Sequence, residues 1–164
     1  MRKELFAISI IFLFLIAGCL QKNEFSNTPE LRFIGMSKDS LMQGFSKEDS
    51  IVFLMELTDG DGDIGFGDGD TLSESILITD LRTGNISEQF NIPKIPENVV
   101  VNGLQAEMQL KLFTTCCLLP ENIPPCDKSD KYPYDTLQYE IIIIDRAGNK
   151  SEPVLTPPII LICN

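Results

Sequence analysis

One segment of the chain carries side chains suited to binding a hard cation. Residues 59–70 read DGDGDIGFGDGD. Its five carboxylates belong to Asp59, Asp61, Asp63, Asp68 and Asp70. Calcium and magnesium bind several oxygen ligands at short range, and glycine permits the positive φ values that curl a chain around an ion. This acidic loop (59–70) therefore predicts a structural calcium site, with magnesium or a cation-free solvated turn as the alternatives.

The first part of the acidic loop resembles the calcium loop of an EF-hand. Asp59, Asp61 and Asp63 match the first three ligand positions of that loop, and Asp70 falls at the twelfth. Ile64 stands where the EF-hand has a glycine, and the flanking sequences indicate strands rather than helices. The resemblance therefore implies calcium binding without the EF-hand architecture.

The N-terminal residues have the pattern of an export signal. A basic start is followed by an apolar run over 5–17, which ends in Ile-Ala-Gly-Cys19. This ending resembles the lipobox of bacterial lipoproteins, and the resemblance implies a signal peptide over 1–18, a lipidated Cys19 and a tether over 19–29. The alternative is a permanent membrane anchor, but the apolar run is short for a spanning helix.

Charge and composition narrow the functional classes. The formal net charge is −11, which disfavours nucleic acid and anionic headgroups as partners and favours cations, sugars or other proteins. The chain has no histidine, so mechanisms that pair histidine with a serine or cysteine nucleophile are excluded. We therefore expect no catalysis, and a carboxylate-based glycoside hydrolase is the enzyme alternative.

The remaining cysteines predict crosslinks. Assigning Cys19 to lipid leaves Cys116, Cys117, Cys126 and Cys163, an even number that indicates two disulfides in an exported chain. Adjacent cysteines rarely bridge each other, so two pairings remain open: 116–126 with 117–163, or 116–163 with 117–126. Free buried thiols are the alternative.

Alternating apolar and polar residues predict about seven strands and no helix. The expected strands are 30–36, 51–58, 75–81, 86–92, 104–113, 137–144 and 159–163. Short strands separated by turn signals are typical of a β-sandwich. The sequence therefore predicts an all-β domain over 30–164, folded as a single antiparallel β-sandwich.

One predicted turn resembles a known family. Residues 139–151, YEIIIIDRAGNKS, are similar to the last hairpin of bacterial immunoglobulin-like and fibronectin type III-like domains. In that hairpin a strand ends at an aspartate, here Asp145, turns through Ala-Gly-Asn149 and returns. The resemblance implies an immunoglobulin-like sandwich. The whole layout also resembles small exported lipoproteins of Bacteroidetes-type bacteria.

Strand direction predicts which connections meet. If consecutive strands run in opposite directions, the acidic loop shares one end of the sandwich with the 145–158 connection, and the four cysteines gather at the other end. We therefore expect Asp145 and Asn149 to add oxygen ligands to the cation site.

These features together predict a lipid-anchored binding or structural module of the cell envelope. Leu20 rather than aspartate follows Cys19, which by resemblance to bacterial lipoproteins favours the outer membrane, facing the periplasm or the surface. The expected partners are the membrane, through the lipid, and an unknown protein or glycan. A carbohydrate-binding or surface-attachment accessory of an envelope assembly is the alternative.

Overall fold

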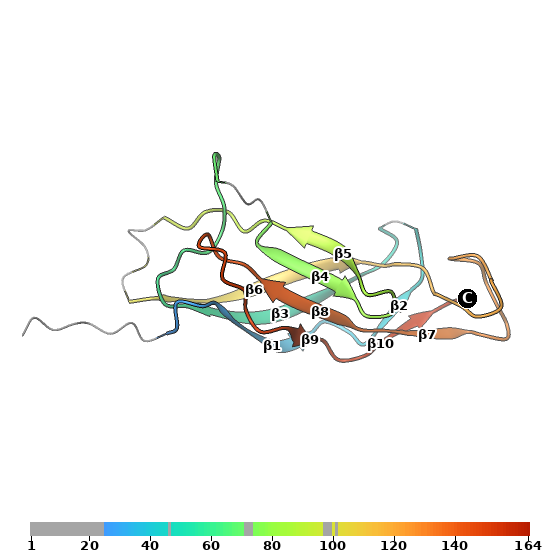
Figure 1. Ribbon diagram of the computed structural model, residues 1–164. Coiled ribbons are helices and arrows are strands. Elements are labelled where there is room, and N and C mark those ends of the chain that lie inside the picture. Colours follow the sequence, from blue (N-terminus) through green and yellow to red (C-terminus); the bar gives the residue numbers. More distant parts are fainter. Residues whose placement is uncertain (1–24, 46, 71–73, 97–99, 101) are drawn as a thin grey trace, which may run out of the picture.

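The computed structural model of the protein describes residues 25–164 except for 46, 71–73, 97–99 and 101 (Figure 1). The predicted signal peptide, Cys19 and tether residues 19–24 therefore lie outside the described residues. Within the described ranges every regular element is a strand, and no helix there is long and apolar enough to cross a membrane. The prediction of an all-β chain is confirmed for this part of the protein.

The described residues form ten strands. They are β1 (Glu30–Met36), β2 (Ser40–Met42), β3 (Ser50–Asp59), β4 (Ile76–Asp80), β5 (Asn85–Phe90), β6 (Leu104–Phe113), β7 (Tyr134–Leu137), β8 (Tyr139–Ile143), β9 (Val154–Leu155) and β10 (Ile159–Ile162). Each of the seven predicted segments overlaps one of the strands β1, β3, β4, β5, β6, β8 and β10, with differences of up to two residues at their ends.

Two larger sheets form a sandwich-like arrangement. One has the order β1-β3-β6 and the other the order β5-β4-β8-β9, and all their pairings are antiparallel. Side chains alternate between buried and partly exposed positions along β3, β4 and β8, as the two-residue period of a strand requires. Phe53 of β3 meets Tyr139 of β8 edge to face, with ring centroids 6.2 Å apart, so one core joins the two sheets.

A third, smaller sheet departs from the prediction. It has the order β2-β10-β7, and β2 runs parallel to β10, so the prediction of a wholly antiparallel sandwich is wrong at this pair. β2 has three residues, of which only Leu41 is buried, too few to show an alternation in sequence. The chain between β9 and β10 contains Pro157 and Pro158, which lack an N–H donor and so interrupt the strand. Before this break β9 pairs with β8, and after it β10 pairs with β7 in the third sheet.

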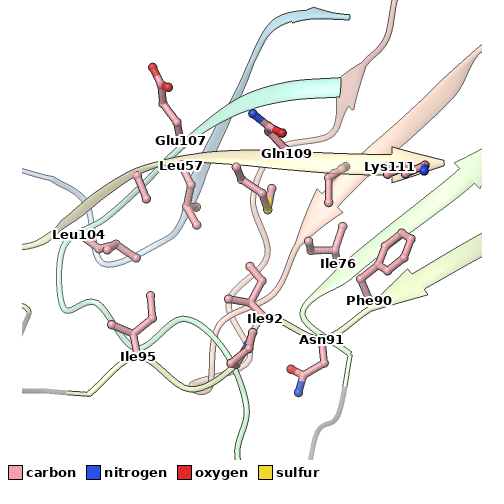
Figure 2. Close-up of a pocket in the computed structure, with 14 residues that line it drawn as sticks. Leu57, Ile76, Phe90, Asn91, Ile92, Ile95, Leu104, Glu107, Gln109 and Lys111 are labelled. Carbon is pink, nitrogen blue, oxygen red and sulfur yellow. The ribbon is translucent and has the colours of Figure 1, made fainter. Parts of the chain in front are cut away.

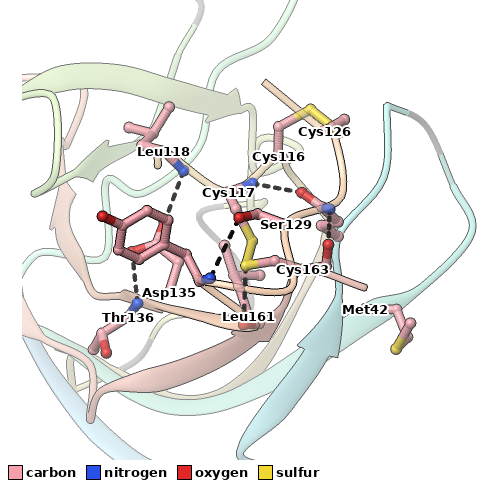
Figure 3. Close-up of a disulfide and its surroundings, with 12 residues drawn as sticks. Met42, Cys116, Cys117, Leu118, Cys126, Ser129, Asp135, Thr136, Leu161 and Cys163 are labelled. Atoms are coloured by element: carbon pink, nitrogen blue, oxygen red, sulfur yellow. Dashed lines mark hydrogen bonds between the residues drawn. A yellow bond between two sulfur atoms is a disulfide. The ribbon is translucent and has the colours of Figure 1, made fainter. Parts of the chain in front are cut away.

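Two disulfides close the end of the molecule that carries the C-terminus (Figures 1 and 3). The structure pairs Cys116 with Cys126 and Cys117 with Cys163, the first of the two arrangements that the sequence left open. The side chain of Gln43 accepts a hydrogen bond from the Cys117 N–H and donates one to the Cys163 carbonyl. The crosslinked end therefore also holds the segment that follows β2.

We predict unequal stabilisation by the two bridges. The Cys117–Cys163 bridge spans 46 residues and the Cys116–Cys126 bridge spans 10. Loop-closure entropy then assigns about 4 kcal/mol to the first bridge and about 3 kcal/mol to the second. Replacing each pair by serines and measuring the free energy of unfolding in denaturant tests this order. A larger loss for the 116–126 pair would contradict the entropic account.

Candidate metal centre

The candidate site begins where β3 ends. Residues at odd positions of β3 face the core, and Asp59, the last residue of the strand, keeps that parity. It is consequently fully buried, with 0 % of its surface exposed, although it is a carboxylate. Burying a charge in this way is costly unless other groups compensate it.

The acidic loop then folds back over Asp59. Gly62 and Gly65 adopt φ values of 67° and 83°, a backbone conformation that favours glycine. Close packing also demands glycine at Gly60, because a Cβ atom there would lie 2.4 Å from the carbonyl oxygen of Phe25. The loop is therefore held tightly against the segment that enters the domain before β1.

Three of the predicted ligands converge. One carboxylate oxygen from each of Asp59, Asp61 and Asp63 lies within 4.8 Å of the other two. Asp59 Oδ2 accepts a hydrogen bond from the Asp63 N–H at 3.0 Å. Asp59 is buried, Asp63 partly buried and Asp61 exposed, so the cluster reaches from the interior to the surface.

The turn at 145–149 packs against this cluster, as strand direction predicted. The N–H of Arg146 donates to the Asp63 carbonyl, and the N–H of Ala147 donates to Asp63 Oδ2, both at 3.0 Å. The Arg146 guanidinium donates to the carbonyls of Ile64 and Gly65 at 3.1 Å. Sequence reasoning did not assign Arg146 a role, because only the folded turn brings its side chain to the acidic loop.

The other predicted ligands have different surroundings. Asp145 is fully buried, and its two oxygens accept hydrogen bonds from the N–H and the side-chain amide of Asn149 at 2.7 and 2.8 Å. Asp145 and Asn149 thus bind each other within the turn. Asp68 and Asp70 are exposed, and Asp70 accepts a hydrogen bond from Gly67. The structure does not bring these last two residues into the three-aspartate cluster.

The electrostatics of the cluster favour an added positive charge. Burial first, and then the charges of Asp61 and Asp63, raise the pKa of Asp59 from 3.8 to about 7. Burial and the charge of Asp145 likewise raise the pKa of Asp63. Among the described residues, Asp59 Oδ1 and Asp63 Oδ1 are buried side-chain oxygens without a hydrogen-bond partner. A cation bound here would supply what these two oxygens lack.

Comparison with known proteins assigns no family to this arrangement. No family model matches the chain, and no curated protein or solved structure matches it. The function is therefore inferred from the chain's own residues.

We predict that the cluster makes stability depend on pH when a chelator is present. A carboxyl whose folded pKa is raised favours the protonated folded state, so its contribution is lost as pH rises. For Asp59 the loss falls between about pH 4 and about pH 7. The free energy of unfolding should decline over this interval more steeply in the wild type than in Asp59→Asn. Equal pH slopes for the two proteins would contradict the raised pKa.

Proposed function

We propose that the protein is a lipid-anchored, non-catalytic module of the cell envelope, with a binding or structural role and a calcium ion that stabilises its acidic loop. The outer membrane is the proposed location. The calcium site and the anchor rest on separate observations, and each has its own test.

The pair of buried, unpartnered oxygens on Asp59 and Asp63 carries the calcium proposal. Asp61 adds a third carboxylate that is open to solvent, so an ion has a route to the cluster. Carboxylate and carbonyl oxygens are the ligands that calcium prefers, and calcium tolerates irregular coordination. When bound, the ion would neutralise the negative charges of the three aspartates, and their carboxylate oxygens are suitable calcium ligands.

A structural role for the ion is supported by what the acidic loop contacts. The Gly60 N–H donates to the Ser26 carbonyl at 2.6 Å, and Asp63 is bonded to the 145–149 turn. An ion at the cluster would therefore fix three segments together: the end of β3, that turn, and the described end of the proposed tether, which contains Ser26. The ion would thus stiffen the end of the domain nearest the proposed anchor.

An immunoglobulin-like identity for the sandwich is supported by strand order. In immunoglobulin-type sandwiches the first, second and fifth strands (A, B and E) share one sheet, and strands C, F and G share the other. The β1-β3-β6 sheet groups the strands that correspond to A, B and E, and β4 and β8 correspond to C and F in the other sheet, whereas the last strand, β10, lies in the third sheet. Sandwiches of this class present their loops to partners, which fits a module that binds rather than catalyses.

A carbohydrate-binding accessory is the second candidate, favoured by exposed aromatic rings. Tyr134, at the start of β7, is 63 % exposed, and Phe45 is 81 % exposed. Gly44, next to Phe45, donates to the Thr115 carbonyl beside the disulfides. The two rings therefore belong to the crosslinked end, and sugars commonly stack on such rings.

We predict that calcium stabilises the wild-type protein through the three-aspartate cluster. For a dissociation constant of about 0.1 mM and calcium at about 1 mM, the stabilisation is about 1.4 kcal/mol. Asp61→Asn with Asp63→Asn should abolish the calcium-dependent rise in melting temperature, since both ligands lose their charge. Asp68→Asn with Asp70→Asn is the matched control and should retain the rise. If calcium raises the melting temperature of the Asp61 and Asp63 variant but not that of the control, this ligand assignment is wrong.

We predict that Cys19 anchors the chain. Cys19→Ser should shift the protein from the membrane fraction to the soluble fraction and prevent incorporation of a labelled fatty acid, because acylation needs the thiol. Cys126→Ser, which removes a disulfide partner instead, should leave the protein in the membrane fraction. Continued fatty-acid labelling of Cys19→Ser would disprove the lipid attachment without affecting the calcium proposal.

A further inference from the structure

β6 leaves one edge of its sheet open. It is the outer strand of the β1-β3-β6 sheet in the described part of the chain. Thr114, directly after β6, donates its N–H to the Asp49 carbonyl at 3.0 Å, in continuation of the β3–β6 register. Because hydrogen-bonded pairs alternate along an antiparallel ladder, even-numbered residues of β6 bond to β3. The odd-numbered residues, 105 to 113, direct their backbone groups outward.

An apolar groove of about 490 Å³ lies beneath this edge. Met108 and Leu110 of β6 line one side, and Phe90, Ile92 and Ile95 line the other. Figure 2 shows Glu107 and Gln109 on the opposite side of β6, away from this groove. An unpaired strand edge beside open apolar surface is a site at which proteins add another strand.

The outer face of β6 carries two charges that form no ion pair within the described chain, although the Lys111 ammonium lies over the Phe113 ring, 5.1 Å from its centroid. Glu107 lies opposite Glu56 of β3, an unfavourable pairing of like charges, and Glu56 is already bound to Arg32. The ion pairs of the described residues include neither Glu107 nor Lys111. A cation near Glu107 and an anion near Lys111 would therefore give each of these side chains an ion-pair partner.

We propose that β6 pairs antiparallel with β6 of a second copy of the chain, about a two-fold axis at Gln109. In β6 the outward backbone groups belong to the odd-numbered residues, so each odd-numbered residue must face an odd-numbered residue of the second copy. The permitted registers therefore differ by steps of two residues. Centring the axis on Gln109 places Glu107 opposite Lys111 of the second copy, and the symmetry repeats this pair. Centring it on Met108 or Leu110 instead places Glu107 opposite Gln109 or Phe113.

The pairing joins the two three-stranded sheets into a single sheet of six strands. Met108 of each copy then lies opposite Leu110 of the other on the groove side, so the exposed apolar surface becomes covered. The inference depends neither on calcium nor on the lipid. In a lipid-anchored pair the two chain starts would point in opposite directions, so the long axis of the dimer would lie along the membrane.

Disulfide trapping at the two-fold axis tests the register. In a hydrogen-bonded antiparallel pair the facing Cα atoms lie about 5.5 Å apart, within the range that a disulfide spans. Full-length Gln109→Cys in membranes should therefore give a dimer band on a non-reducing gel under mild oxidation. Gln105→Cys is the control on the same strand, since its two thiols would be about 27 Å apart. A folded protein that crosslinks equally at both positions, or at neither, would overturn the proposal.

Charge exchange tests the partner. In the Gln109→Cys background, Glu107→Lys or Lys111→Glu should weaken association about ten-fold, because two cross-strand pairs change from attraction to repulsion. The double exchange should restore crosslinking. Glu88→Lys, on the exposed strand β5, is the matched charge reversal and should have no effect. If the double variant is as weak as the single ones while its melting temperature is unchanged, the pairing of copies is wrong.

Discussion

The alternation of side chains along β3 is the constraint on which the rest of the structure depends. Phe53 and Met55 fill the core because they lie on the inward side of this strand. The same parity carries Asp59 to the bottom of the acidic loop, where its carboxylate is as buried as the core side chains. The strand that builds the hydrophobic centre therefore also creates a charge that must be compensated.

Segments far away in sequence compensate part of the negative charge of the acidic loop. Backbone N–H groups of the 145–149 turn bond to Asp63, and the Arg146 guanidinium binds carbonyls of the acidic loop. These contacts leave one oxygen of Asp59 and one of Asp63 unpartnered. The proposed calcium ion would bind these two oxygens, since its positive charge and its preference for oxygen ligands suit unpartnered carboxylates.

The two ends of the domain are held by different means. At the end opposite the acidic loop, disulfides join the segment after β6 to the end of β10. Arg82 there donates to both Asp80 and Asp135 at 2.7 Å, so its charge is paired within the protein. At the acidic end most charges are of one sign, and the structure relies on backbone donors and, in our proposal, on a metal. The open edge of β6 runs between these two ends, and in our proposal it pairs with β6 of a second copy.

The sequence by itself determined the all-β class, the seven main strand positions and the juxtaposition of the acidic loop with the 145–149 turn. These follow from local alternation and from strand direction, which are properties of neighbouring residues. Only the tertiary structure decided the cysteine pairing, the parallel β2–β10 contact and which aspartates converge. Asp68 and Asp59 have the same side chain and the same glycine neighbours to one side, but one is exposed and the other buried. Their difference arises from how the loop folds back on β3, because distances between segments, rather than spacing along the chain, set the burial and the field at each carboxylate.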